Sequence, residues 1–234
     1  MNCEIDALGT RQETRAIVGK FVLSEEDRTG MRARMKNTVI YIHGKGGNAD
    51  EAYYYKKFFS DEYDVIGFDY KSELPWEAEV EFPKFFDSLV PKYREISLIA
   101  NSIGAYYSLL SLANKPIKKA MLISPIVDME KLILNMMARL NISEEQLYKE
   151  KIITTSLNES LSWEYFSYAR NHPITWNIPS HILYAGNDNI TSLETMLIFA
   201  NKISASMTVM HNGEHWFHTK EQLAFLDSWF KKLI

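Results

Sequence analysis

The chain has 234 residues, of which 46% are hydrophobic and 24% are charged, as in an ordinary globular protein. These proportions exclude a disordered or fibrous protein. The net charge of −4 offers no basic surface for nucleic acid, and the single cysteine, Cys3, cannot form an internal disulfide. No apolar run is long enough to span a membrane, and the first residues lack the pattern of a signal peptide. We therefore expect a soluble, cytoplasmic protein with neither nucleic acid nor membrane as a partner.

Short apolar segments alternate with amphipathic segments along most of the chain. The predicted strands are Ala16–Leu23, Thr38–Ile42, Val65–Phe68, Ile96–Ala100, Ala120–Ser124, His181–Tyr184 and Met207–Met210. The predicted helices are Ala52–Phe59, Glu77–Tyr93, Ile103–Leu112, Ser192–Ile203 and Lys220–Leu233. This alternation predicts an α/β protein, a three-layer α/β/α sandwich whose mostly parallel central sheet has about six to eight strands.

The alternation lapses between Val127 and about Pro179, where no clear strand is visible. The helical pieces predicted there are Leu132–Leu140, Glu144–Lys151 and Trp163–Arg170. The segment is too apolar and aromatic for a flexible linker. We interpret it as an insertion, about residues 128–178, in a single domain that spans residues 1–234.

A serine stands where an apolar strand meets a helix, in the sequence Ala100-Asn101-Ser102-Ile103-Gly104. A serine on such a tight turn projects its hydroxyl from the sheet edge, and small residues two before and two after it relieve the crowding. The helix start places amide N–H groups where an oxyanion would form. In the alternative interpretation, Asn101 and Ser102 only cap the helix. The position of the pattern favours a nucleophile.

A serine hydroxyl needs a base, and the base needs a carboxylate to orient it. His215 lies between the last predicted strand and the last helix, with His211 and His218 as rivals nearby. Asp188 lies in the loop Ala185-Gly186-Asn187-Asp188 after the strand His181–Tyr184, and Asp128, which also follows a strand, is the alternative acid. Loops at the carboxyl ends of parallel strands are where sites form in α/β proteins. Each residue could equally belong to an ordinary surface loop or turn.

A glycine-rich loop, His43-Gly44-Lys45-Gly46-Gly47, follows the strand Thr38–Ile42. Glycines let the backbone approach a ligand closely, so an amide of this loop can be a second oxyanion donor. The loop has neither the spacing of a phosphate-binding loop nor that of a dinucleotide fingerprint.

Ser102, Asp188 and His215 occur in this order, each after a predicted strand, and the glycine loop follows an earlier one. In these features the sequence resembles the α/β-hydrolase fold superfamily from about Ala16 to the C-terminus. The resemblance implies that Ser102 is the nucleophile, His215 the base and Asp188 the acid. It also implies an oxyanion hole made by the backbone amides of Ile103 and Lys45, with neither metal nor organic cofactor.

Two departures accompany the resemblance. Ala100 stands where the superfamily usually has the first glycine of the serine turn. Ala185 stands where a glycine usually precedes the acid loop, and Gly186 follows it. The inserted segment, about residues 128–178, resembles the lid of that superfamily.

The resemblance implies a serine hydrolase, carboxylesterase-like, that cleaves an ester, thioester or related acyl bond of a small substrate through an acyl-enzyme. Some apolar side chains of the insertion are expected to pack on the sheet domain and others to line an acyl pocket. These candidates are Met129, Leu132, Met136, Met137, Leu140, Trp163, Tyr165, Phe166 and Tyr168. The alternatives are a non-catalytic binding protein, a C–C bond hydrolase or lyase, and a peptidase, although no anchor for a peptide terminus is visible.

Overall fold

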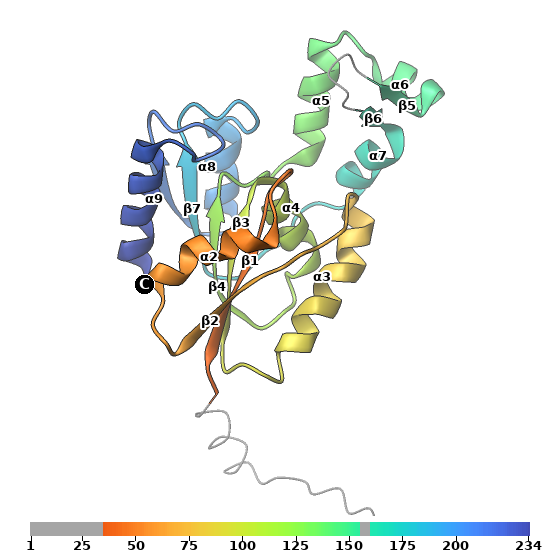
Figure 1. Cartoon of the computed structure of the whole chain (residues 1–234). Helices are drawn as coiled ribbons and strands as arrows, with labels where there is room; N and C mark the ends of the chain where they lie inside the picture. The colour runs from red at the N-terminus through yellow and green to blue at the C-terminus, as the bar shows by residue number, and fades with distance from the viewer. Residues whose placement is uncertain (1–34, 155–159) are drawn as a thin grey trace, which may run out of the picture.

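The computed structural model describes residues 35–154 and 160–234. Within these residues the main sheet has six strands, all parallel, in the spatial order β2-β1-β3-β4-β7-β8 (Figure 1). The strands are β1 (Asn37–Ile42), β2 (Tyr63–Gly67), β3 (Ile96–Asn101), β4 (Ile117–Ile123), β7 (Ser180–Ala185) and β8 (Ser206–Met210). The prediction of a parallel sheet is confirmed, whereas the strand predicted at Ala16–Leu23 lies outside the described residues.

The helices that cover this sheet agree with the sequence pattern except in residues 52–59 and at both ends of the helix predicted at Glu77–Tyr93, which ends at Leu89. They are α2 (Ala52–Tyr55), flanked by the 3₁₀ helices η1 (Ala49–Glu51) and η2 (Lys56–Phe58), and α3 (Pro75–Leu89), α4 (Ser102–Ser111), α8 (Leu193–Lys202) and α9 (Lys220–Leu233). The predicted helix Ala52–Phe59 is thus the short helix α2 followed by η2, and η1 precedes it. Helix α3 begins before Glu77 because Pro75 suits the first turn, where no N–H is needed.

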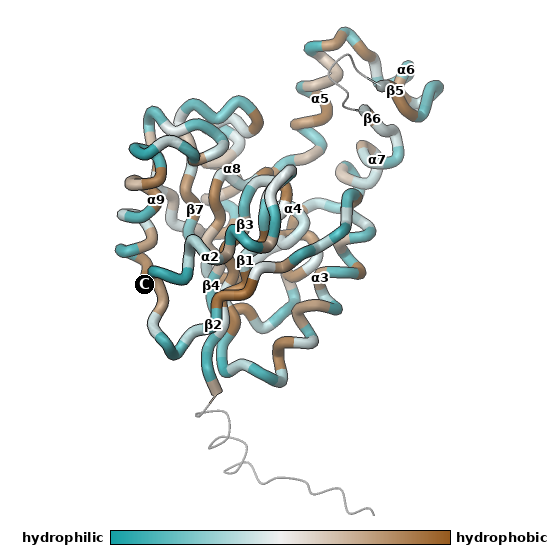
Figure 2. The backbone as a smooth tube through the Cα atoms, in the orientation of Figure 1, coloured by the Kyte–Doolittle hydropathy of each residue, from teal (hydrophilic) through white to brown (hydrophobic). Residues whose placement is uncertain are grey.

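The strands separate two hydrophobic cores because successive side chains along a strand point to opposite faces. Side chains such as Ile40, Leu98 and Leu122 pack beneath α3, α4 and α8. Side chains such as Tyr41 and Ile99 pack beneath α2 and α9. In Figure 2 the colour alternates between teal and brown along α3 and α9, as expected for helices with one buried face. The predicted α/β/α layering is confirmed.

The segment between β4 and β7 projects above α3 and α4 (Figure 1). Its elements are α5 (Met129–Arg139), α6 (Glu144–Glu150), β5 (Ile152–Thr154), β6 (Ser160–Ser162) and α7 (Trp163–Asn171). β5 and β6 pair as a small antiparallel sheet apart from the main one. The expectation that this segment has no strand is therefore wrong. Strands of three residues are too short to show an alternating pattern in the sequence.

Arg170 joins the three helices of the inserted segment. Its guanidinium donates from Nε to Glu130 on α5 at 2.6 Å, and from both terminal nitrogens to Glu144 on α6 at 2.9 and 3.0 Å. On the side facing the main domain, the Tyr168 ring packs edge-on against Trp76 of α3, with ring centroids 5.3 Å apart. The segment is therefore cross-linked within itself and seated on α3.

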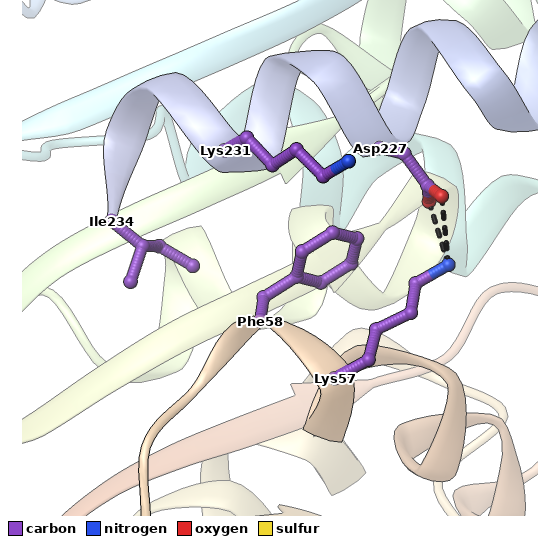
Figure 3. Close-up of a pocket in the computed structure, with 5 residues that line it drawn as sticks. All are labelled: Lys57, Phe58, Asp227, Lys231 and Ile234. Atoms are coloured by element: carbon purple, nitrogen blue, oxygen red, sulfur yellow. Dashed lines mark hydrogen bonds and ion pairs between the residues drawn. The ribbon is translucent and has the colours of Figure 1, made fainter.

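The C-terminal helix α9 is fastened to the turns around α2. Lys57 forms an ion pair with Asp227, at 2.8 Å, and the Phe58 ring projects from η2 towards α9 (Figure 3). Phe58 also stacks on Phe230, with ring centroids 5.1 Å apart. The Tyr54 hydroxyl donates to Asp227 as well. In the described part of the chain, no helix has the length and apolar character needed to cross a bilayer.

Candidate active site

Ser102 is the first residue of α4 and directly follows β3. Its φ of 48° lies in the left-handed region, which residues other than glycine seldom adopt and which is common at functional turns. The turn is tight because Gly104 lies against the end of β1: a Cβ at Gly104 would lie 2.2 Å from the carbonyl oxygen of His43. Ala100 is fully buried within β3, so its methyl group is accommodated in the core without opening the turn.

The structure brings the three predicted residues of the triad together. Ser102 Oγ lies 2.8 Å from His215 Nε2, and His215 Nδ1 lies 2.8 Å from Asp188 Oδ2. The side chain of His215 is 15% exposed and that of Asp188 is 0% exposed. Ser102 and His215 are 113 positions apart in the sequence, and they meet because β3 and β8 end at the same edge of the parallel sheet.

The second oxygen of the Asp188 carboxylate is occupied by its own loop. Oδ1 accepts the backbone N–H groups of Ile190, at 2.7 Å, and Thr191, at 3.1 Å. These two hydrogen bonds fix the carboxylate so that Oδ2 faces His215. Both oxygens of a fully buried acid are thereby satisfied, as burial of a charge requires.

The loops that carry the acid and the base are joined to each other through their backbones. Gly186 donates its N–H to the Met210 carbonyl, at 2.8 Å, and Asn187 donates to the Gly213 carbonyl, at 2.9 Å. A Cβ at Gly186 would lie 2.3 Å from the carbonyl oxygen of His211. This close approach explains why glycine stands one position later than the resemblance implies.

The rival residues lie elsewhere. Asp128 is exposed and caps α5, where its carboxylate accepts a backbone N–H at 2.9 Å. His211 is exposed. The ring of His218 stacks on Trp216, with centroids 4.7 Å apart, and its Nδ1 lies 2.7 Å from the Trp216 carbonyl oxygen. Among the described residues, His215 is the histidine that is hydrogen-bonded to the serine of the turn.

The glycine loop lies beside the serine turn. A Cβ at Gly44 would be 3.2 Å from the Cβ of Ser102, which measures how closely the two segments approach. The loop is closed by a hydrogen bond from the N–H of Gly47 to the carbonyl of Gly44, at 3.1 Å. Lys45 lies within this turn, and Ile103 follows Ser102 in the first turn of α4. The role of their two amides as oxyanion donors stays a prediction.

Solved structures of other proteins share this architecture. The chain is similar to alpha/beta hydrolase domain-containing protein 10 from mouse, with 15% identity over 84% of this chain and 90% of that one and a TM-score of 0.67. It is also similar to Est1E from Butyrivibrio proteoclasticus, with 15% identity over 85% and 87% and a TM-score of 0.68. A serine hydrolase homologue from Coxiella burnetii matches with 14% identity over 85% of each chain and a TM-score of 0.56. The chain has the α/β-hydrolase fold.

The fold predicted from the sequence is thus confirmed. A comparison with protein-family models and with curated proteins finds no match to this sequence.

In this α/β-hydrolase fold a cavity of about 650 Å³ opens beside Ser102 and His215. Its walls come from the glycine loop, from the turns around α2 and from α9. The lining residues are Tyr41, Gly44, Lys45, Gly46, Gly47, Glu51, Tyr54, Tyr55, Asn101, Ser102, Ile123, Ile190, His215, Trp216, Phe217, Leu223 and Leu226. Most of these side chains are aromatic or aliphatic, so the cavity suits an apolar group with its reactive bond at Ser102.

The nine side chains that the sequence nominated in the inserted segment do not line this cavity, although all of them lie in the described part of the chain. Met129, Met137 and Phe166 are buried in the larger core, and most of the others pack against it. The expectation that the insertion supplies the pocket wall is therefore wrong for this cavity. The sequence did not predict that α2 and α9 wall the cavity, because the spacing of their apolar residues is that of any helix packed on a sheet.

Residues 35–154 and 160–234 contain no group of three or more His, Cys, Asp or Glu side chains that could hold a metal ion.

Proposed function

We propose that the protein is a serine hydrolase that cleaves an ester, thioester or related acyl bond of a small substrate. The observation that carries the proposal is the continuous hydrogen-bonded chain from Ser102 through His215 to Asp188, with 2.8 Å at each link. These distances lie within the range that a nucleophile and its base require. The strained backbone of Ser102 is a second supporting feature, because such strain concentrates at functional turns.

In the proposed reaction, His215 Nε2 removes the hydroxyl proton as Ser102 Oγ attacks the substrate carbonyl carbon. Asp188 accepts the N–H of His215 Nδ1, which selects the tautomer whose Nε2 is free to take the proton. The same carboxylate stabilises the imidazolium that forms. Because Asp188 is buried and held through its other oxygen, it needs no rearrangement to do so.

The tetrahedral intermediate places a negative charge on the former carbonyl oxygen. We propose that the backbone amides of Ile103 and Lys45 donate to this oxygen, one from the helix start and one from the glycine loop. The imidazolium then gives its proton to the leaving group, and the carbon–oxygen or carbon–sulfur bond breaks to leave an acyl-enzyme. A water molecule, deprotonated by His215, hydrolyses the acyl-enzyme by the same steps in turn.

The proposed substrate carries an apolar or aromatic acyl group of moderate size. The cavity volume of about 650 Å³ falls within the range of small-molecule sites. Tyr54, Tyr55, Phe217 and Trp216 give it a strongly aromatic lining, and Trp216 is 74% exposed. The structurally similar Est1E has also been solved with ferulic acid bound, which supports including aromatic esters among the compounds tested.

We further propose that the inserted segment, about residues 128–178 of the single domain 1–234, is a lid. It leaves the main domain directly after β4, whose carboxyl end lies at the edge of the sheet where Ser102 stands, and it rejoins the sheet at the opposite edge, where β7 begins. Its helices are tied together by Arg170, which would let the segment move as a unit. Because the cavity is walled by α2 and α9, such a lid would control access to it without shaping its acyl-binding wall.

A fluorophosphonate probe tests the proposed function directly, because it reacts with an activated serine and not with an ordinary hydroxyl. We expect one adduct, which peptide mass spectrometry assigns to Ser102, and none in the Ser102→Ala variant, whose circular dichroism remains native. Turnover of a panel of aryl and alkyl esters should disappear in the same variant.

The alternatives give different results. A non-catalytic binding protein would neither react with the probe nor turn over any ester. A C–C bond hydrolase would react with the probe but cleave diketones in place of esters, and a peptidase would cleave peptides. Ester turnover that survives Ser102→Ala would overturn the proposal.

A further inference from the structure

Three side chains form a hydrogen-bonded bridge between the serine turn and the glycine loop. Asn101 Nδ2 donates to the hydroxyl oxygen of Tyr41 at 2.9 Å, and the Tyr41 hydroxyl donates to Glu51 Oε2. The other carboxylate oxygen, Glu51 Oε1, accepts the backbone N–H of Asn48 at 3.3 Å. The bridge therefore passes through the Glu51 carboxylate, and each of its two oxygens accepts one hydrogen bond.

The two ends of the bridge adjoin the segments that the proposed reaction uses. Asn101 immediately precedes Ser102, and Asn48 immediately follows the glycine loop that contains Lys45. The middle of the bridge is anchored in the core, because Tyr41 is 1% exposed and stacks on Tyr55 with ring centroids 4.9 Å apart. Because packing holds the Tyr41 ring rigidly, the positions of Asn101 and Glu51 depend on each other.

The glycine loop rests directly on the carboxylate of Glu51. A Cβ at Gly47 would lie 2.8 Å from Glu51 Oε1 and 3.1 Å from Oε2, so the absence of a side chain permits the contact. Glu51 also completes a capping box with Asn48 at the start of η1. Capping alone explains the bond to Asn48, but it does not explain the bond to Tyr41.

The direction of each hydrogen bond in the bridge is fixed. Burial, with the nearby Tyr55 and Glu51, raises the pKa of the Tyr41 hydroxyl, so it remains a donor to the carboxylate at neutral pH. Asn101 Oδ1 is buried and has no hydrogen-bond partner in the described structure, so the bond to Tyr41 is what orients this amide. Loss of the carboxylate would leave the Tyr41 hydroxyl buried without its acceptor.

We propose that Glu51 is a positioning residue that acts through Tyr41 and Asn101. It holds the glycine loop and the serine turn at a fixed separation, and thereby sets the distance between the Lys45 amide and the acyl carbon bound at Ser102. The inference deepens the proposed function and rests on it. Oxyanion donors act only when they are already in place, and a misplacement of about 1 Å can cost about 100-fold in rate.

Variants of the bridge test this inference on the best ester found in the panel. Glu51→Ala removes both acceptors and should lower kcat about 10- to 100-fold with KM nearly unchanged, because the oxyanion that the Lys45 amide stabilises forms only in the transition state. Glu51→Gln keeps an oxygen that can accept from Tyr41 and should retain more activity than Glu51→Ala. Tyr41→Phe should resemble Glu51→Ala, and the double variant Tyr41→Phe/Glu51→Ala should be hardly worse than either alone, because one bridge is broken in all three.

Asp50→Ala is the matched control, because Asp50 is the neighbouring exposed carboxylate and does not line the cavity. It should leave kcat and KM unchanged. Amide hydrogen exchange of residues 44–48 gives a readout that does not depend on turnover: it should accelerate in Glu51→Ala and Tyr41→Phe but not in Asp50→Ala.

The outcomes separate the inference from the proposed function. Unreactive wild-type protein would refute the hydrolase, whereas unchanged exchange at residues 44–48 in Glu51→Ala would refute the positioning role in either case. A raised KM at constant kcat in Glu51→Ala would assign Glu51 to substrate contact and overturn the inference. A lowered melting temperature with unchanged kcat would show that Glu51 only caps a helix, and this result would also overturn the inference.

Discussion

Asp188 holds His215 through one carboxylate oxygen and holds its own loop through the other. Oδ2 lies 2.8 Å from His215 Nδ1, while Oδ1 accepts the backbone N–H groups of Ile190 and Thr191. The side chain is fully buried, so water does not compete for either oxygen. The orientation of the histidine is therefore set by a group that cannot rotate away.

Asp188→Asn should reduce kcat about 10⁴-fold, by analogy with the equivalent change in serine proteases, because the amide favours the wrong tautomer of His215. Steady-state ester hydrolysis measures this effect. Asp128→Asn is the matched control and should keep its activity, since asparagine caps a helix as well as aspartate does. If Asp128→Asn lost as much activity as Asp188→Asn, the assignment of the acid would be wrong.

Gly104→Ala should destabilise the protein and slow its reaction with the fluorophosphonate probe. The added methyl group would lie 2.2 Å from the carbonyl oxygen of His43, so α4 must shift away from β1 and carry Ser102 with it. Overpacking of this kind costs about 1–3 kcal/mol. Thermal unfolding and the labelling rate measure the two effects. Ser111→Ala, on the same helix, removes a hydroxyl without a partner and should change neither. An unaltered melting temperature in Gly104→Ala would contradict the tight contact.

Leu223→Trp should shift the preference of the enzyme towards short acyl groups. Leu223 lies on α9 and lines the cavity, so a larger side chain occupies volume that a long acyl chain needs. Each methylene that no longer fits costs about 10-fold or more in kcat/KM. The ratio of kcat/KM for octanoyl and acetyl esters measures the shift. Leu140→Trp, in the inserted segment, should leave the ratio unchanged. The opposite pattern would place the acyl group under the insertion.

Arg170→Ala should loosen the inserted segment and speed its cleavage by proteases. The change removes the hydrogen bonds to Glu130 and Glu144, and exposed pairs of this kind contribute about 1 kcal/mol or less. Lys149→Ala is the control, because it breaks the pair with Glu145 within α6 alone and should not alter the joint. If proteases cleave the inserted segment equally fast in Arg170→Ala and wild type, the aromatic packing on α3 is enough to hold the segment together.

The hydrogen bonds between Arg170 and Glu144 should weaken in acid. Hydrogen bonds from Arg170 hold the pKa of the Glu144 carboxyl below its ordinary value. The stabilisation is therefore complete above the pKa of an unfolded glutamate, about 4.3, and is lost as the pH falls through the lower folded value. Proteolysis by an acid-active protease across this range should show less acid dependence in Arg170→Ala than in wild type.

The position of the serine turn could be predicted from the sequence because strand, small residues and helix all lie within one short stretch. Asp188 and His215 could be nominated because parallel strands deliver their following loops to one edge of the sheet. The sequence favoured His215 over His211 and His218, but only the structure shows which of these rings faces Ser102, since three positions in a loop decide it. The sequence carries no signal at that scale.

The cavity wall and the bridge could not be predicted, for a physical reason. Tyr41 and Tyr55 have the spacing of core residues, and both are in fact buried. A buried tyrosine hydroxyl needs a hydrogen-bond partner, and this requirement gives core tyrosines a further role. Packing across the sheet decides which residue becomes the partner. Glu51, met in the sequence, is only an acidic residue near a helix start.

The two halves of the candidate site rest on parts of the sheet that differ in strength. β3, which carries Ser102, lies between β1 and β4, whereas β8, which precedes His215, ends the strand order of the described sheet and pairs with β7 alone. Terminal strands fray before central ones when a protein opens locally. We therefore expect mild denaturant to displace His215 while Ser102 is still held in place. Activity should then be lost before the rest of the sheet unfolds.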